Sequence, residues 1–267
     1  MSYTLKKINS IEIEPINLKT IKTENIKGHA YIPMLYSNVF ICTRKGSGKT
    51  TVLFNILKNC INKSTKVVIF CSTHNNDRGW IKIKEWLNDR KQPHVFYDAI
   101  FDDTVSNIEM LIEKLKLDAE QKQQNKKDGK LAPKSLLFND AKEKTDKPHK
   151  EKQKAPKYFI VFDDISNELR AKKDVQTLLK HMRHFRSKIV VSSQFPNDLD
   201  PASRMQIDFW MMFKGFSEDR LEQVYPQLDL NDMDFEKFYK IYKDVTKEPH
   251  NFLYIDKGQN EMRQNFN

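Results

Sequence analysis

The amino-acid sequence predicts an α/β fold with a mostly parallel central sheet flanked by helices. Short apolar runs alternate along the chain with segments of helical period. These runs are continuous rather than interrupted by polar residues, which is typical of strands covered on both faces. A turn containing Gly46 and Gly48 joins the first run directly to a helix-period segment. At 267 residues, the chain is long enough for one such core with an insertion.

The expected elements follow in order from residue 37. We expect strands at 37–42, 66–71, 95–97, 158–162, 188–192, 208–213 and 252–255. We expect helices at 49–61, 80–87, 105–117, 168–185, 218–225 and 233–242. Residues 1–36, broken by Pro15 and Pro33, are an expected extended lead-in that packs on the core or adds an edge strand, with a DNA-contacting basic arm as the alternative.

The expected main domain, residues 37–256, is interrupted by a lysine-rich stretch at 118–157. This stretch is rich in Lys, Gln, Asp and Asn, so we expect a flexible insertion that is poorly ordered. We interpret this stretch first as a solvated linker. The alternative is that its lysines bind nucleic acid electrostatically. Residues 257–267 are expected to form a polar C-terminal tail.

The chain is basic, with a formal net charge of +10 and a pI near 9.3. This charge suits a polyanionic partner, although charge spread over the surface for solubility would give the same total. Cys42, Cys60 and Cys71 are scattered without metal or disulfide spacing, so we expect a reducing compartment. We recognise no signal peptide and no apolar run as long as a membrane span.

Residues 43–50, Thr-Arg-Lys-Gly-Ser-Gly-Lys-Thr, match the phosphate-binding loop pattern except that Thr43 replaces the first glycine. Glycines let backbone N–H groups turn toward phosphate oxygens, and the following helix offers its positive end to the same anion. Lys49 is placed to reach the β and γ phosphates, and Thr50 to ligate Mg²⁺. An ordinary glycine turn is the alternative. The expected nucleotide-binding residues are Lys45, Gly46, Ser47, Gly48, Lys49, Thr50 and Thr51.

An acid pair, Asp163 and Asp164, ends the apolar run at 158–162. An acid at the carboxyl end of a strand beside the phosphate loop can hold the water shell of Mg²⁺. We therefore expect Asp163 to be the metal-side acid, on a strand neighbouring the first one. We expect Asp164 to polarise the attacking water as a general base, with a helix N-cap or a solvated charge as the alternative.

Two further polar segments fall where strands are expected to end. Gln194 follows the run at 188–192, where its amide can contact a γ-phosphate or the attacking water. Residues 72–77 follow the run at 66–71 and can touch nucleotide or a neighbouring subunit, or form an ordinary loop.

With these motifs in place, the chain resembles the genome-packaging ATPases of large double-stranded DNA viruses, the poxvirus-type branch of the FtsK–HerA superfamily. The resembling segments are TRKGSGKT at 43–50, YFIVFDDIS at 158–166 and HMRHFRSKIVVSSQFP at 181–196. Their order and spacing match over about residues 37–256. The resemblance implies a RecA-like P-loop NTPase domain with an extra acid-bearing strand. It also implies a ring of subunits, often six, that hydrolyses ATP with Mg²⁺ to drive DNA into a preformed shell.

The resemblance assigns residue roles by position. Lys49, Thr50, Asp163 and Gln194 fall on the phosphate, metal and sensor positions. Asp164 stands where the superfamily commonly has Glu, and this shorter acid implies slow turnover. An arginine from the next subunit usually completes such sites, and the candidates are Arg183, Arg186 and Arg204. The implied partners are double-stranded DNA and possible capsid or portal-vertex proteins, in a virion or a viral factory of the host cytoplasm.

Other functions share parts of this pattern. A DNA-transfer or secretion ATPase or a helicase would use the same nucleotide motifs. Thr43 and Asp164 also allow a nucleotide-binding structural subunit with little or no turnover. A small-molecule kinase is disfavoured because we find no lid segment with arginines. A GTPase is disfavoured because no Asn-Lys-x-Asp segment follows a strand.

Overall fold

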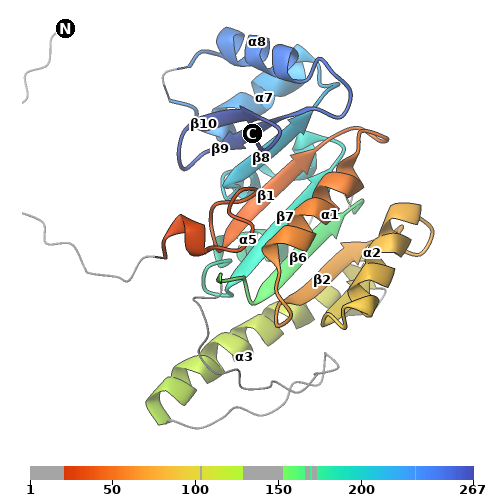
Figure 1. The fold of residues 1–267 in the computed structure, drawn as a ribbon, viewed down its shortest axis with the longest axis vertical. Coiled ribbons are helices and arrows are strands. Elements are labelled where there is room, and N and C mark those ends of the chain that lie inside the picture. The colour runs from red at the N-terminus through yellow and green to blue at the C-terminus, as the bar shows by residue number, and fades with distance from the viewer. Residues whose placement is uncertain (1–20, 103, 129–152, 166–168, 170–172, 232) are drawn as a thin grey trace, which may run out of the picture.

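The computed structural model describes residues 21–102, 104–128, 153–165, 169, 173–231 and 233–267. Within these residues, the chain forms an eight-stranded sheet in the order β10-β9-β8-β1-β7-β6-β2-β3 (Figure 1). The strands are β1 (Ser37–Cys42), β2 (Lys66–Cys71), β3 (His94–Tyr97), β6 (Tyr158–Asp163), β7 (Ser187–Ser193), β8 (Phe209–Phe213), β9 (Phe252–Asp256) and β10 (Glu261–Gln264).

The strands from β8 to β3 in this order run parallel to their neighbours, so their carboxyl ends meet at one edge. At the other side of the sheet, β9 runs antiparallel to β8, and β10 antiparallel to β9. The mostly parallel sheet expected from the sequence is therefore confirmed. A parallel arrangement places every loop that follows such a strand at the same edge, where ligands bind in open α/β sheets.

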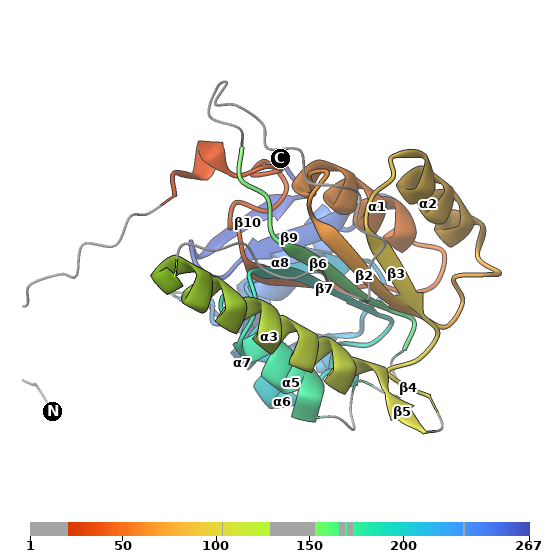
Figure 2. The same cartoon turned by 90° about the horizontal axis from the view of Figure 1, so that it is seen from below.

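Helices cover both faces of the sheet (Figure 2). One face packs against α1 (Lys49–Cys60) and α2 (Arg78–Asp89), and the other against α3 (Asn107–Asp128), α5 (Lys173–Lys180), α7 (Glu218–Leu228) and α8 (Phe235–Val245). Shorter elements are η1 (Thr23–Asn25), β4 (Phe101–Asp102), β5 (Val105–Ser106), η2 (Pro196–Asp198) and α6 (Pro201–Arg204). In β1, Phe40 faces one layer and Ile41 the other. This two-sided burial explains why the strands read as continuous apolar runs.

Two expected helices end five or more residues away from their predicted ends. The helix expected at 105–117 begins at Asn107 and continues to Asp128, because residues 118–128 are rich in the good helix formers Gln and Lys. Residues 118–128, the first part of the expected flexible insertion, are thus helical. Residues 129–152 of the insertion lie outside the residues that the structure describes. The helix expected at 168–185 ends at Lys180, and turns occupy 181–186. Residues 166–168 and 170–172 also lie outside the described part.

Both ends of the described chain add to the core. Ile26 and Ile32 are buried, so the described part of the lead-in packs on the domain. The prediction of a polar tail at 257–267 is wrong in part. Strand β10 lies within this segment and pairs with β9, so it extends the sheet. Phe266 then packs its ring against Tyr31 at a centroid distance of 4.7 Å. In the described part of the chain, no helix combines the length and apolar character needed to span a membrane.

Candidate active site

The phosphate loop connects β1 to α1 at the carboxyl edge of the sheet. Gly46 and Gly48 have left-handed φ values of 81° and 92°, a conformation that glycine adopts without a steric penalty. Thr43 has no positive φ and is fully buried, and its N–H donates to the Ser193 carbonyl oxygen at 3.0 Å. Because this backbone is ordinary, the first position accommodates threonine without strain.

The loop presents its central residues to solvent. Lys45, Gly46 and Thr51 are exposed, and residues 47–50 are half-buried. Gly48 is the N-cap of α1, so the first N–H groups of this helix lack intrahelical acceptors. Such a helix start binds anions.

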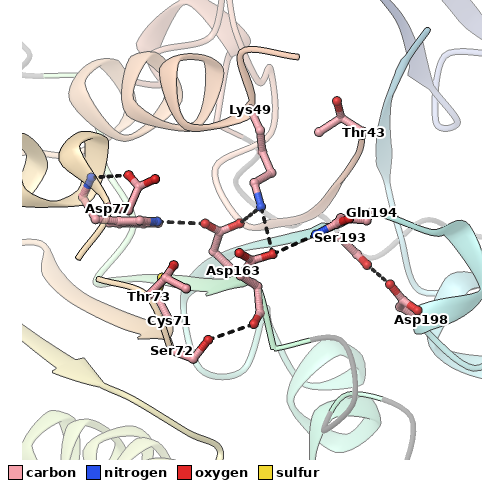
Figure 3. A network of polar contacts seen from close by, with 12 residues as sticks. Thr43, Lys49, Cys71, Ser72, Thr73, Asp77, Asp163, Ser193, Gln194 and Asp198 are labelled. Carbon is pink, nitrogen blue, oxygen red and sulfur yellow. Dashed lines mark hydrogen bonds and ion pairs between the residues drawn. The ribbon is translucent and has the colours of Figure 1, made fainter. Parts of the chain in front are cut away.

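Lys49 meets both acids of the predicted pair (Figure 3). Its Nζ lies 2.8 Å from Oδ1 of Asp163 and 3.6 Å from Oδ1 of Asp164. Burial acts to lower the pKa of Lys49, but the two carboxylates outweigh it, and the pKa is raised from its usual value. The lysine is therefore held as a cation at the end of the loop.

The strand that carries Asp163 is not the direct neighbour of β1, contrary to our expectation. β7 lies between β1 and β6, pairing with both. Neighbouring strands are about 4.8 Å apart, so the two motifs are separated by about twice that distance across the sheet. The long side chain of Lys49, starting from a loop above β1, spans this separation.

Asp163 has a second partner that sequence analysis missed. The Trp80 indole Nε1 donates to Oδ2 of Asp163 at 2.8 Å, and these side chains are almost fully buried. Trp80 lies in the first turn of α2, whose N-cap, Asp77, accepts hydrogen bonds from Gly79 N and Trp80 N. The loop at 72–77 therefore helps to bring α2 to the site. No sequence motif marks Trp80, because its role depends on how α2 packs.

Asp164 and Gln194 form the other side of the site. The Gln194 Nε2 lies 3.4 Å from Oδ1 of Asp164, and the Ser72 hydroxyl donates to the Asp164 carbonyl oxygen at 3.1 Å. Asp164 has a left-handed φ of 56°, which is uncommon for a residue other than glycine. Its side chain is about one-third exposed, so water reaches the carboxylate.

The predicted arginines are not part of this cluster. Arg183 and Arg186 lie in the turn before β7, at the edge of the sheet opposite the phosphate loop. Arg186 donates to the Asp118 carbonyl oxygen at 3.4 Å, and Arg183 is exposed. Arg204 is buried, and its Nη1 donates to acceptors in Pro196, Asn197 and Leu199. Arg204 is thus engaged within its own chain, and Arg183 is the candidate most accessible to a neighbour.

The residues at the site suit a magnesium ion. Thr50 supplies a hydroxyl and Asp163 a carboxylate, and Mg²⁺ in nucleotide sites takes one or two protein oxygen ligands together with substrate phosphates. The first turn of α2 lies against both residues, since a Cβ at Gly79 would lie 2.8 Å from the Thr50 methyl Cγ2 and the Trp80 indole donates to Asp163. Among the described residues, no cluster of three or more His, Cys, Asp or Glu could hold a metal ion.

A pocket of about 340 Å³ opens beside the phosphate loop, on the side away from Asp163. It is lined by Arg44, Lys45, Gly46, Ser47, Phe213, Lys214, Pro249, His250 and Asn251. The His250 ring lies over the loop, with Nδ1 3.2 Å from the Ser47 carbonyl oxygen. Sequence analysis missed the wall formed by residues 249–251, because these residues precede β9 and carry no motif.

Comparison with known proteins gives matches in structure alone. No protein-family model and no curated protein matches the chain. The genome packaging NTPase B204 from Sulfolobus turreted icosahedral virus 2 matches in complex with AMPPCP, with a TM-score of 0.54 at 16% identity over 86% of this chain and 97% of that chain. Its complex with AMP gives a TM-score of 0.53 at 17% identity over the same shares.

The crystal structure of B204, the DNA-packaging ATPase from Sulfolobus Turreted Icosahedral Virus, is a further match. Its TM-score is 0.51 at 16% identity, over 86% of this chain and 98% of that chain. At this level of identity, the likeness establishes a shared fold. The α/β fold with a mostly parallel central sheet is thereby confirmed, and the P-loop NTPase fold that the resemblance implied is shared with these solved structures.

Proposed function

We propose that this chain is an ATPase that translocates double-stranded DNA, and that its task is to package a viral genome into a preformed capsid. The observation that carries the proposal is the 2.8 Å contact between Lys49 Nζ and Asp163 Oδ1 at the end of a glycine loop. It joins the two nucleotide motifs, which lie far apart in sequence, into one site. The fold shared with a viral packaging NTPase supports DNA as the substrate.

The proposed nucleotide orientation follows from the sheet order. The terminal phosphates lie at Lys49, because the two acids stand on the β6 side of the loop. The nucleoside end then leaves on the opposite side of β1, toward β8 and β9, where the pocket lined by Phe213 and His250 lies. Backbone N–H groups of residues 45–51 hold the phosphates between these two ends.

Thr50 and Asp163 would hold the magnesium ion, the latter directly or through water. When bound there, the ion would supply positive charge that stabilises the negative charge of the phosphates. Asp163 is suited to this role because it is buried and its two oxygens are oriented by Lys49 and Trp80.

Asp164 acts as the group that orients and polarises the attacking water. Its carboxylate is partly exposed and lies beside both Lys49 and Gln194. The Gln194 amide donates to Asp164 at 3.4 Å, and so couples the tip of β7 to the position of this base. A change at the γ-phosphate thus reaches β7 through a hydrogen bond.

The proposed motor is a ring of identical subunits, often six, in which an arginine of one subunit reaches the site of the next. Such arginines increase the rate of hydrolysis by a factor of about 10³–10⁵. Arg183 is the most accessible of the predicted candidates, because it is exposed and Arg204 is engaged internally. Capsid or portal-vertex proteins are the proposed partners at the shell, in a virion or viral factory.

The test of this proposal is phosphate release from ATP, measured with and without double-stranded DNA across protein concentration. Lys49→Ala is expected to lower turnover by about 10²–10³, because the group that stabilises phosphoryl charge is lost. Lys58→Ala is the matched control, since Lys58 is an exposed residue of the same helix. Wild-type turnover in Lys49→Ala would overturn the site assignment.

The same assay separates the rival functions. A nucleotide-binding structural subunit would bind ATP and release no phosphate, even with DNA and at high protein concentration. A helicase would separate strands, and a DNA-transfer ATPase would share the DNA-stimulated hydrolysis without a capsid. Stimulation by DNA without strand separation supports a packaging or DNA-transfer ATPase over a helicase or a structural subunit, and stimulation by the capsid then supports packaging.

A further inference from the structure

The two carboxylate oxygens of Asp163 have different partners. Oδ1 faces the Lys49 amine at 2.8 Å, and Oδ2 accepts the Trp80 indole N–H at 2.8 Å. We propose that Trp80 is a positioning residue that holds Asp163 in the orientation needed for Mg²⁺. This inference rests on the proposed nucleotide site. It identifies the contact that orients Asp163, the proposed magnesium ligand.

The two partners respond differently to nucleotide. The Lys49 ammonium lies at the end of a long stem of rotatable bonds, so phosphate oxygens can compete with Asp163 for it. The indole N–H of Trp80 is a donor with no acceptor function, and it belongs to a rigid ring that is 1% exposed. If phosphates draw Lys49 away, Oδ2 would stay bonded to Trp80 and Oδ1 would be free to act as a metal ligand.

The position of Trp80 is itself fixed from several sides. Asp77 caps the helix and binds the Trp80 backbone N–H at 3.0 Å. The Trp80 ring meets Phe96 edge-on, with centroids 6.2 Å apart. Gly79 packs so closely that a Cβ there would lie 2.8 Å from Cγ2 of Thr50. The first turn of α2 therefore contacts Thr50 through Gly79 and Asp163 through Trp80.

A purely structural role for Trp80 predicts a different outcome. A buried indole needs an acceptor for its N–H, and Asp163 would then serve the tryptophan rather than the reverse. In that case, loss of the N–H changes the stability of the fold and leaves metal affinity unchanged. A positioning role predicts a specific loss of metal affinity, because residues that orient a metal ligand typically contribute about 10–100-fold.

The experiment measures Mn²⁺ binding, by electron paramagnetic resonance, to the full chain saturated with a non-hydrolysable ATP analogue. Trp80→Phe removes the indole N–H and is expected to weaken Mn²⁺ binding by about 10–100-fold. Nucleotide affinity in the presence of EDTA is expected to remain that of the wild type. Trp86→Phe is the matched control, because Trp86 lies on the same helix and packs against Phe54 away from Asp163.

A second variant removes the risk that Trp80→Phe does not fold. Benzothienylalanine at position 80 keeps the size and shape of the indole and replaces the N–H by sulfur. Equal Mn²⁺ affinity in this variant and in the wild type would overturn the inference. A wild-type chain that binds the analogue in EDTA but gains no Mn²⁺ would overturn the proposed metal site as a whole. Neither readout requires turnover, so the outcome does not depend on ATP hydrolysis.

Discussion

The candidate active site depends on a few charged residues whose positions fix one another. Lys49 lies 2.8 Å from Asp163 and 3.6 Å from Asp164, and Gln194 lies 3.4 Å from Asp164. Asp163 is buried and Asp164 is partly exposed, so the neighbouring acids stand in different environments. Different environments suit different tasks, metal binding for the first acid and proton transfer for the second.

The role of Asp164 is tested by Asp164→Asn. Asparagine tolerates the left-handed φ of 56° as well as aspartate does, so the substitution removes the charge and preserves the backbone. We expect turnover to fall by about 10²–10⁴ while ATP affinity is retained, because a general base contributes in this range. Phosphate release and binding of a fluorescent ATP analogue measure the two quantities.

Asp164→Glu is the companion variant. Its carboxylate reaches farther, so it is expected to keep measurable turnover when Asp164→Asn does not. Equal turnover in Asp164→Asn and the wild type would assign Asp164 to a structural role at the turn after β6.

Among the elements, β7 connects the two nucleotide motifs. It pairs with β1 on one side and with β6 on the other, and Gln194 follows its carboxyl end. Its amino end carries Lys188, which is fully buried with Nζ 3.4 Å from the Ile32 carbonyl oxygen. Burial lowers the pKa of Lys188, with Cys60 and Asp208 opposing the shift. The strand thus ends beside the candidate active site and carries a fully buried lysine near its other end.

Lys188→Met is expected to stabilise the fold at neutral pH by about 1–4 kcal/mol, because an apolar side chain replaces a buried charge. The sign of the pH dependence follows from the lowered pKa. Below the folded-state pKa, the wild type carries the full cost of the buried ammonium. That cost disappears as pH rises toward the ordinary value of 10.5, where the unfolded chain also loses the proton.

Urea unfolding of both chains across this range measures the difference in free energy. The stability gap between Lys188→Met and the wild type is expected to narrow as pH rises. A gap that stays constant with pH would show that the variant acts through packing rather than through the charge. Lys58→Met, at an exposed position of α1, controls for the loss of one lysine.

For the whole molecule, the net charge of +10 is the property that bears most directly on DNA. A motor that moves along DNA of any sequence must contact the phosphates rather than the base edges. Contacts with phosphates release bound counterions, so they weaken as the salt concentration rises. Affinity for duplex DNA should therefore fall steeply with salt and be insensitive to sequence.

We expect affinity to fall by about 10³–10⁵ between roughly 50 and 200 mM salt if about 6–10 phosphates are contacted. Fluorescence anisotropy with two duplexes of unrelated sequence, across a salt series, measures both properties. A salt-independent affinity, or a strong preference for one duplex, would argue against a sequence-independent translocase.

Local patterns predicted much of this architecture. The bounds of β1 and β2 agree with the predicted 37–42 and 66–71, because each strand is an apolar run with buried faces on both sides. The bounds of α3 and α5 were wrong, since helix propensity extends the first and turns at 181–186 shorten the second. β10 was missed because an edge strand of polar residues gives no apolar signal.

The sequence by itself determined the phosphate loop and the acid pair, because glycines, lysine and carboxylates at fixed spacing perform chemistry that few other residues perform. The tertiary structure alone decided that β7 separates β1 from β6, that Trp80 binds Asp163, and that Arg204 is engaged within its own chain. Each of these features depends on contacts between segments that lie far apart in the sequence. Such contacts arise from the order of strands and the packing of helices, which local patterns do not encode.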